Sequence, residues 1–266
     1  MAEVDVTPRA RSALAGVAVP TEHGGWGLTA EPVLLGLLVA PSVAGALLGV
    51  AAVLAFLART PLRVVLVDRH RGRSLDRTAL AGRVLAAEVL VIAALAAAAA
   101  VVATGPFWWP ALVAAPLVAL ELWYDTRSRS RRLAPELAGT WAIGAVSAMV
   151  VLASGHGGGE ALAVWLVVGA RATSSVPHVI AQVSRLHGRA TSARRLLLAD
   201  AAALSAVAAA VGVDHRAAIG AAAVVIAVAV QRPLARTPVP AKTIGIRQSI
   251  LGLAVVLTAA LGFHLL

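Results

Sequence analysis

Long apolar runs separated by short polar connections dominate the sequence. The runs consist mainly of alanine, valine and leucine and are longer than β-strands. Barrel strands alternate apolar and polar residues with period two, whereas about 20 continuous apolar residues form a membrane-spanning helix. The pattern therefore predicts an all-α polytopic membrane bundle of about nine transmembrane helices. The predicted spans are residues 24–40, 42–58, 83–103, 107–123, 136–153, 160–180, 196–213, 217–230 and 246–266.

The first two runs are short for a span, and Pro41 separates them. They either cross the membrane one by one or form a re-entrant hairpin, and the orientation of the later helices is the same in both cases. Residues 1–20 lack the strong apolar segment of a signal peptide. We therefore expect a short, flexible cytoplasmic tail over residues 1–20 and a single transmembrane domain over residues 21–266.

Basic residues are concentrated in alternate connections. Every second connection, together with the N-terminal tail and Arg171, holds all the lysines and arginines except Arg216. Cytoplasmic loops of membrane proteins are enriched in lysine and arginine. The alternation therefore predicts nine crossings, with the N-terminus in the cytoplasm and the C-terminus outside. The basic connections are also the longer ones, which favours a functional face on the cytoplasmic side.

Composition supports a membrane protein and limits its chemistry. The chain is 59% hydrophobic and 14% charged, whereas a soluble domain is about half apolar and a quarter charged. Cysteine is absent, which excludes disulfides, thiolate metal sites and cysteine nucleophiles. The net charge of +10 follows from the basic connections, so we expect the lipid bilayer and not nucleic acid as a partner. No phosphate loop, nucleotide fingerprint or zinc motif is present, and we predict no metal site.

Polar residues gather where the first run begins. Glu22 and His23 precede a glycine-rich segment with Trp26, and Glu31 lies inside the run. An ionisable group in hydrocarbon costs on the order of 2.5–3.5 kcal/mol, so these residues predict a polar pocket. Glu22, His23 and Glu31 are candidate acids or bases, and Trp26 is a candidate ligand contact. A buried Glu31 carboxylate would have to be protonated or paired.

A second group of candidates lies on one face of the sixth run. Arg171, Ser175, His178 and Gln182 follow one another at spacings of three and four residues, which puts them on one side of a helix. This face begins at membrane depth, where polar side chains need partners, and we predict that it lines a ligand pocket. Other candidate ligand contacts near the ends of spans are Arg59, Arg63, Asp68, Arg69, Glu136 and Arg247. For Glu136, a favourable interaction with its own helix dipole is the alternative.

Short motifs support a family resemblance. The segment Glu22-His23-Gly24-Gly25-Trp26, followed by an apolar hairpin, resembles the Glu-His-Gly-Ala-Trp signature of the YwiC-like family of bacterial membrane proteins. Pro135-Glu136-Leu137 and Gly245-Ile246-Arg247 also resemble the pattern of that family. The resemblance extends over nearly the whole chain and implies a location in the bacterial inner (cytoplasmic) membrane. It implies no particular activity.

The architecture has a second resemblance. Nine runs with long polar connections after the second and sixth resemble the UbiA superfamily of intramembrane prenyltransferases. There, aspartate-rich motifs at these two places hold magnesium and a prenyl diphosphate. This chain has only Asp68 and Asp76 at the first place and no aspartate at the second, which argues against a magnesium bridge and leaves the cofactor unassigned. Arginines can still bind a diphosphate directly.

Three functions are compatible with these features. The first is binding of an amphiphile, an isoprenoid or a phospholipid, in a basic cytoplasmic cavity. Its phosphate or diphosphate head would lie against Arg59, Arg63, Arg171 and Arg247; a diverged prenyltransferase would be a catalytic form of this function. The second is transport of a small solute or ion, suggested by acidic residues within or near spans. The third is a non-catalytic membrane partner that docks an acidic protein. We expect the first.

Overall fold

The structure, a computed structural model of the 266-residue chain, describes residues 13–18, 25–128, 132–235, 237 and 239–266. All the regular elements in these residues are helical. The helices are α1 (Ala13–Ala18), α2 (Gly25–Val39), α3 (Val43–His70), α4 (Asp76–Val102), α5 (Trp109–Thr126), α6 (Leu133–Ala153), α7 (Gly158–Leu186), α8 (Ala193–Val213), the 3₁₀-helix η1 (His215–Ala217), α9 (Ala218–Leu234) and α10 (Ala241–Leu265).

The predicted all-α, multi-pass membrane architecture is confirmed. Each predicted span falls on one of the helices α2 to α10. Among the described residues, seven helical segments are long and apolar enough to cross a membrane: α3, α4, α6, α7, α8, η1 with α9, and α10. α2, with 15 residues, is shorter than this length, and the last turns of α5 carry two acidic residues.

Several helices continue beyond the predicted spans. α3 extends to His70 instead of ending near residue 58, α7 extends to Leu186, and α10 begins at Ala241. Apolar runs mark only the part of a helix that lipid would surround, whereas arginine and lysine are good helix formers beyond it. Segments expected as basic loops are therefore partly helical. Likewise, residues 13–18 of the expected tail form α1, whose Val17 packs against α3 and α4.

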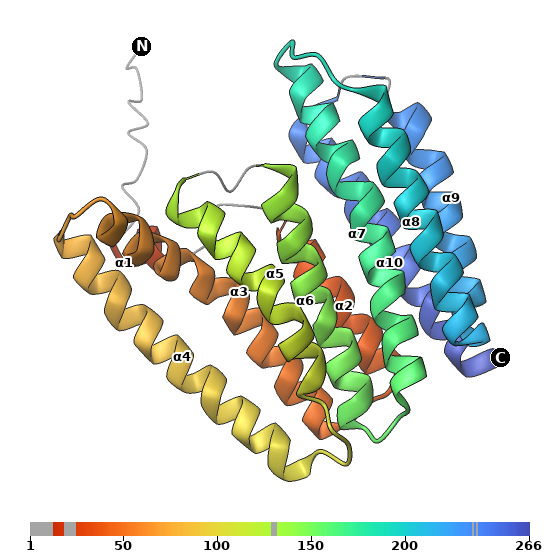
Figure 1. Cartoon of the computed structure of the whole chain (residues 1–266), viewed down its shortest axis with the longest axis horizontal. Helices are drawn as coiled ribbons and strands as arrows, with labels where there is room; N and C mark the ends of the chain where they lie inside the picture. Colours follow the sequence, from red (N-terminus) through yellow and green to blue (C-terminus); the bar gives the residue numbers. More distant parts are fainter. Residues whose placement is uncertain (1–12, 19–24, 129–131, 236, 238) are drawn as a thin grey trace, which may run out of the picture.

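Successive helices from α2 to α10 run in alternating directions, so their connections fall at two opposite ends of the bundle (Figure 1). The connections after α3, α5, α7 and α9 share one end. These are the connections in which the arginines are concentrated, and we call this end the arginine end. The connections after α2, α4, α6 and α8 share the other.

The bundle is built around α7. Along its apolar segment 83% of the residues are buried, compared with 6% for α4. α7 packs against α2, α6, α8, α9 and α10, whereas α4 packs on α3 and α1 at one edge of the molecule (Figure 1). Small residues allow close packing: a Cβ atom at Gly169 of α7 would meet the ring of Trp141 on α6 at 2.6 Å. Polar residues on α7 therefore face other helices and not lipid.

Candidate functional site

The sequence-predicted site residues are distributed over several separate groups of contacts. One group joins α3 to α5, a second joins α3 to α4, and a third joins α7 to α8, α9 and α10. Glu22 and His23 lie outside the described residues. The single basic cavity expected from the sequence is therefore not assembled from all of its predicted members.

Arg59 joins α3 to α5 through two carboxylates. Its Nη2 atom lies 2.9 Å from Glu121 Oε1, and its Nε atom donates to Asp125 Oδ2 at 3.1 Å. The Asp125 side chain is fully buried. Gly139 of α6 provides the space for the Glu121 carboxylate, since a Cβ atom there would overlap it. Two acidic groups thus compensate the charge of Arg59, which favours a structural role for this residue.

Asp68 closes the turn between α3 and α4. Its buried carboxylate accepts two hydrogen bonds from Arg77, at 2.7 and 3.1 Å, and one from the Thr78 hydroxyl at 2.7 Å. The Asp68 carbonyl accepts a hydrogen bond from the Arg73 amide, and Gly72 takes the positive φ of 64° that the turn requires. Both carboxylate oxygens of Asp68 therefore accept hydrogen bonds from the protein itself, and we infer that Asp68 stabilises this turn as a clamp.

Asp200 is the centre of the polar contacts of α7. Its buried carboxylate accepts hydrogen bonds from Ser174 Oγ at 2.8 Å and from Arg232 Nε at 2.9 Å. His178 Nε2 lies 3.1 Å from the same carboxylate, which assigns the ring proton to Nε2. The three partners satisfy an acid that would otherwise be costly in the bundle interior.

A chain of side-chain hydrogen bonds extends from this centre across the bundle. Gln231 of α9 donates to Ser174 Oγ at 3.2 Å, and Gln248 of α10 donates to Gln231 Oε1 at 3.2 Å. Arg171 Nη2 in turn donates to the carbonyl of Gln248 at 2.8 Å and to its Oε1 at 2.9 Å. We call this set, with Asp200, His178 and Arg232, the α7 network.

The α7 network contains residues that the sequence analysis did not select. The helical spacing identified Arg171 and His178, and the same count would have reached Ser174. Their partners Asp200, Gln231 and Gln248 lie on other helices, and spacing along one helix contains no information about them. Ser175 and Gln182, which were selected, donate only long hydrogen bonds of 3.4 Å to carbonyls of α7 itself.

Glu31 lies at the contact between α2 and α10. Its carboxylate occupies the space over Gly252, because a Cβ atom at this position would overlap it. The guanidinium of Arg171 attracts this carboxylate electrostatically, although no hydrogen bond or ion pair within 4.0 Å joins these two described side chains. Arg171 is only 2% exposed, and its Nε and Nη1 atoms have no hydrogen-bond partner among the described residues.

The remaining candidates lie on α2, α3, α6 and α10. Trp26 of α2 packs edge-on against Phe56 of α3, with ring centroids 5.1 Å apart. Arg69 is exposed at the end of α3, and Arg247 is partly buried on α10. Arg63 and Glu136 are partly buried near the arginine end, and both take part in interactions.

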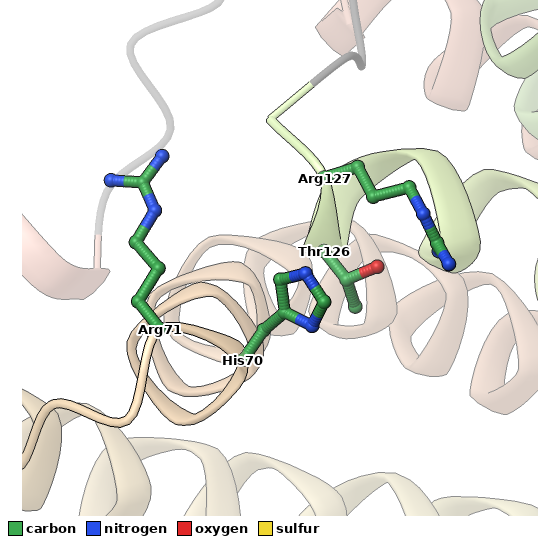
Figure 2. Close-up of a pocket in the computed structure, with 4 residues that line it drawn as sticks. All are labelled: His70, Arg71, Thr126 and Arg127. Atoms are coloured by element: carbon green, nitrogen blue, oxygen red, sulfur yellow. The ribbon is translucent and has the colours of Figure 1, made fainter.

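A pocket of about 450 Å³ opens at the arginine end. It is lined by His70 and Arg71 at the end of α3 and by Thr126 and Arg127 at the end of α5. Figure 2 shows Arg71 and Arg127 on either side of His70 and Thr126. Among the described residues, no carboxylate belongs to this lining.

The two pocket arginines contact neutral groups. Arg71 Nη2 donates to Ser128 Oγ at 3.0 Å. Arg127 donates to the Trp123 carbonyl at 3.2 Å, and its guanidinium lies 4.1 Å from the centroid of the Trp123 ring. Arg59, Arg77 and Arg232, in contrast, are each paired with a carboxylate. The pocket therefore retains positive charge that an anionic ligand can use.

Metal ligands do not converge in the part of the chain that the structure describes. No group of three or more histidine, cysteine, aspartate or glutamate side chains there is arranged to hold an ion. The buried aspartates Asp68, Asp125 and Asp200 each form an ion pair with an arginine.

Comparison with known proteins identifies the family. A family model described as YwiC-like protein matches residues 19–154, just over half of the chain. The match begins before α2 and ends as α6 ends. No curated protein and no solved structure matches the chain, so the resemblance to the UbiA superfamily is not confirmed. This multi-pass membrane protein belongs to the YwiC-like family.

Proposed function

We propose that this protein binds an amphiphile with a phosphate or diphosphate head in the pocket formed by His70, Arg71, Thr126 and Arg127. The arginine end faces the cytoplasm of a bacterial cell in this proposal, in accordance with the enrichment of lysine and arginine in cytoplasmic loops. The residues 1–20 then form a cytoplasmic tail, and the remaining chain forms one transmembrane domain.

The observation that carries the proposal is that the contacts described for Arg71 and Arg127 are with neutral groups. An arginine already paired with a carboxylate gains little from a second anion, whereas these two guanidinium groups retain their full charge. Arginine binds phosphate oxygens through parallel N–H donors. The Thr126 hydroxyl and the His70 ring add further donors at the pocket lining.

The surface of α5 next to the pocket suits an apolar tail. Trp123, Leu120 and Val113 are 47%, 39% and 57% exposed. Their spacing from Arg127 places them on the same face of α5, so an apolar stripe leads from the pocket toward the other end of the bundle. Tryptophan is favoured where a membrane meets water, which agrees with Trp123 lying directly beneath Arg127.

The contacts support a different head-binding site from the one predicted from the sequence. That prediction combined Arg59, Arg63, Arg171 and Arg247. Arg59 is now balanced by Glu121 and Asp125, and Arg171 belongs to the α7 network. Among the described residues that line the new pocket, His70 is the only candidate acid or base. We therefore propose that the protein binds the amphiphile and does not transform it chemically.

Native mass spectrometry of the purified protein tests this function. The probes are geranylgeranyl monophosphate and phosphatidic acid, which distinguish an isoprenoid from a phospholipid, with phosphatidylcholine as a lipid of zero net charge. In the double variant that combines Arg71→Ala with Arg127→Ala, we expect the phosphorylated probes to bind at least tenfold more weakly than to the wild type. The reason is that a hydrogen bond to a charged group contributes about 1.5–3 kcal/mol, and 1.4 kcal/mol is tenfold in affinity.

The matched control removes two arginines from the same end of the bundle. Arg189 and Arg194 are exposed near the connection between α7 and α8. Arg189→Ala with Arg194→Ala should leave the binding within about twofold, apart from the general attraction that salt screens. Equal losses in both double variants, or unchanged binding after loss of Arg71 and Arg127, would refute the assignment of the head to this pocket.

A further inference from the structure

A second cavity lies at the arginine end, between α6, α7 and α8. Its volume is about 150 Å³, and it shares no lining residue with the pocket between α3 and α5. Its polar lining consists of Ser184 on α7, Thr191 and Ser192 in the connection that follows, and Arg195 on α8. The other lining residues are apolar. The polar groups therefore come from three consecutive segments of the chain that surround one space.

The three hydroxyl groups of this lining have hydrogen atoms to donate. Thr191 Oγ1 accepts a hydrogen bond from Arg185 Nε at 3.0 Å, and Ser192 Oγ accepts one from the Arg195 amide at 3.3 Å. These contacts use only the hydroxyl oxygens, so the hydrogen of each hydroxyl remains available. The partly buried Ser184 hydroxyl forms no hydrogen bond with the other described residues.

The charge of the lining is positive. Among the described residues, Arg195 is the only charged residue that lines the cavity, and its guanidinium pairs with no described carboxylate. The acid of α8, Asp200, is paired with Arg232. Glu136 lies one turn after Leu133 of the lining but does not line the cavity itself, and it takes part in an interaction. The positive charge of Arg195 is therefore available to a ligand.

We propose that this second cavity binds a phosphate group, either inorganic phosphate or a phosphate monoester. The Arg195 guanidinium donates to two of the phosphate oxygens, and the hydroxyls of Ser184, Thr191 and Ser192 donate to the others. All four polar side chains of the lining thus act as donors, which selects an anion with several acceptor oxygens. A tetrahedral phosphate can meet donors on several sides, whereas a carboxylate is planar.

The size and the apolar part of the cavity agree with this ligand. Cavities for drug-sized molecules have volumes of about 300–1,000 Å³, so a cavity of about 150 Å³ has room for a phosphate group but not for a long apolar chain. Leu133, Pro177 and Leu196 belong to its apolar lining. Apolar surroundings lower the local dielectric constant, which strengthens hydrogen bonds from the four donors to a bound anion.

Isothermal titration calorimetry with inorganic phosphate, on the protein in phosphatidylcholine nanodiscs, tests the proposal. The background is the double variant Arg71→Ala with Arg127→Ala, in which the pocket between α3 and α5 has lost its arginines. We expect phosphate to bind this background, and Arg195→Gln to weaken the binding by about tenfold or more. The matched control is Arg194→Gln, because Arg194 is also exposed but does not line the cavity; its effect should stay within about twofold.

A third variant separates binding from folding and from net charge. Ser184→Ala removes one donor but no charge and no hydrogen bond to another described residue. It should weaken phosphate binding by about tenfold, since a hydrogen bond to a charged group is worth that much, and it should leave the midpoint of thermal unfolding unchanged.

Two competitors identify the source of the phosphate group. Glycerol 3-phosphate presents it from the solution, and phosphatidic acid added to the nanodisc presents it from the lipid surface. Displacement of inorganic phosphate by either competitor supports the proposal, and the more effective one identifies the source. The proposal is overturned if phosphate does not bind, if neither competitor displaces it, or if Arg194→Gln weakens binding as much as Arg195→Gln does.

Discussion

At the scale of single residues, the role of a charged side chain depends on what another helix places beside it. Arg171 and His178, which lie on one face of α7, both belong to the α7 network and take their partners from α8 and α10. Asp68 is held by Arg77 and Thr78, whereas the partner described for Arg71, three residues further on, is the neutral Ser128 hydroxyl.

Replacement of Asp68 tests its role as a clamp. Asp68→Ala removes the acceptor for Arg77 and Thr78, and hydrogen bonds to a charged group contribute about 1.5–3 kcal/mol each. Because Arg77 is 58% exposed and can be hydrated again, we expect a loss of about 2 kcal/mol in the free energy of unfolding. This loss would be measured as a lower midpoint temperature in thermal unfolding of the detergent-solubilised protein.

The matched control is Asp76→Ala, at an exposed position in the first turn of α4. A carboxylate there interacts with the helix dipole, which accounts for about 0.3–1 kcal/mol at most. If Asp68→Ala and Asp76→Ala unfolded at the same temperature, Asp68 would stabilise the protein no more than an exposed acid does, and its role as a clamp would be refuted.

At the scale of elements, apolar runs located every membrane helix but not all of their ends. The run 42–58 is only the apolar part of α3, which continues to His70 through Pro61. The apolar pattern reports where lipid would be, whereas a helix ends where its backbone hydrogen bonding ends. The pocket could not be predicted from the apolar pattern, because the pocket residues lie at the ends of α3 and α5, beyond the apolar runs.

Packing between elements gives a prediction at Gly169. A Cβ atom there would lie 2.6 Å from the Trp141 ring, and overpacking of this kind costs about 1–3 kcal/mol. Gly169→Ala should therefore lower the unfolding midpoint by several degrees. The same substitution at Gly82, on the exposed α4, should leave it unchanged or raise it slightly, because alanine is favoured over glycine in an open helix by about 0.5–1 kcal/mol. A stabilising effect at Gly169 would show that α6 and α7 do not pack in this way.

At the scale of the whole molecule, the charge pattern and the direction of the helices agree. The arginine-rich connections alternate with arginine-poor ones along the chain, and Figure 1 places them at opposite ends of the bundle. The bundle itself could be predicted because every span carries a local signal. The pairing of helices across the bundle could not, since α7 contacts α2 and α10 through residues that are distant in the sequence.

Labelling of single cysteines tests the orientation of the bundle. The chain contains no cysteine, so each introduced thiol is the only one. The proposal places the arginine end in the cytoplasm of a bacterial cell. It therefore predicts that Arg189→Cys reacts with a membrane-impermeant maleimide only after the inner membrane is opened. His156→Cys, at the opposite end, should react in intact spheroplasts. Equal accessibility of both positions would remove the basis for a cytoplasmic basic pocket.

The most direct test of the central claim is a density map of the protein in nanodiscs that contain geranylgeranyl monophosphate or phosphatidic acid. The account predicts an elongated density whose head lies between Arg71 and Arg127 and whose tail follows Trp123 and Leu120 along α5. Density for the phosphate beside Arg59 or Arg171, with the pocket between α3 and α5 empty, would contradict it.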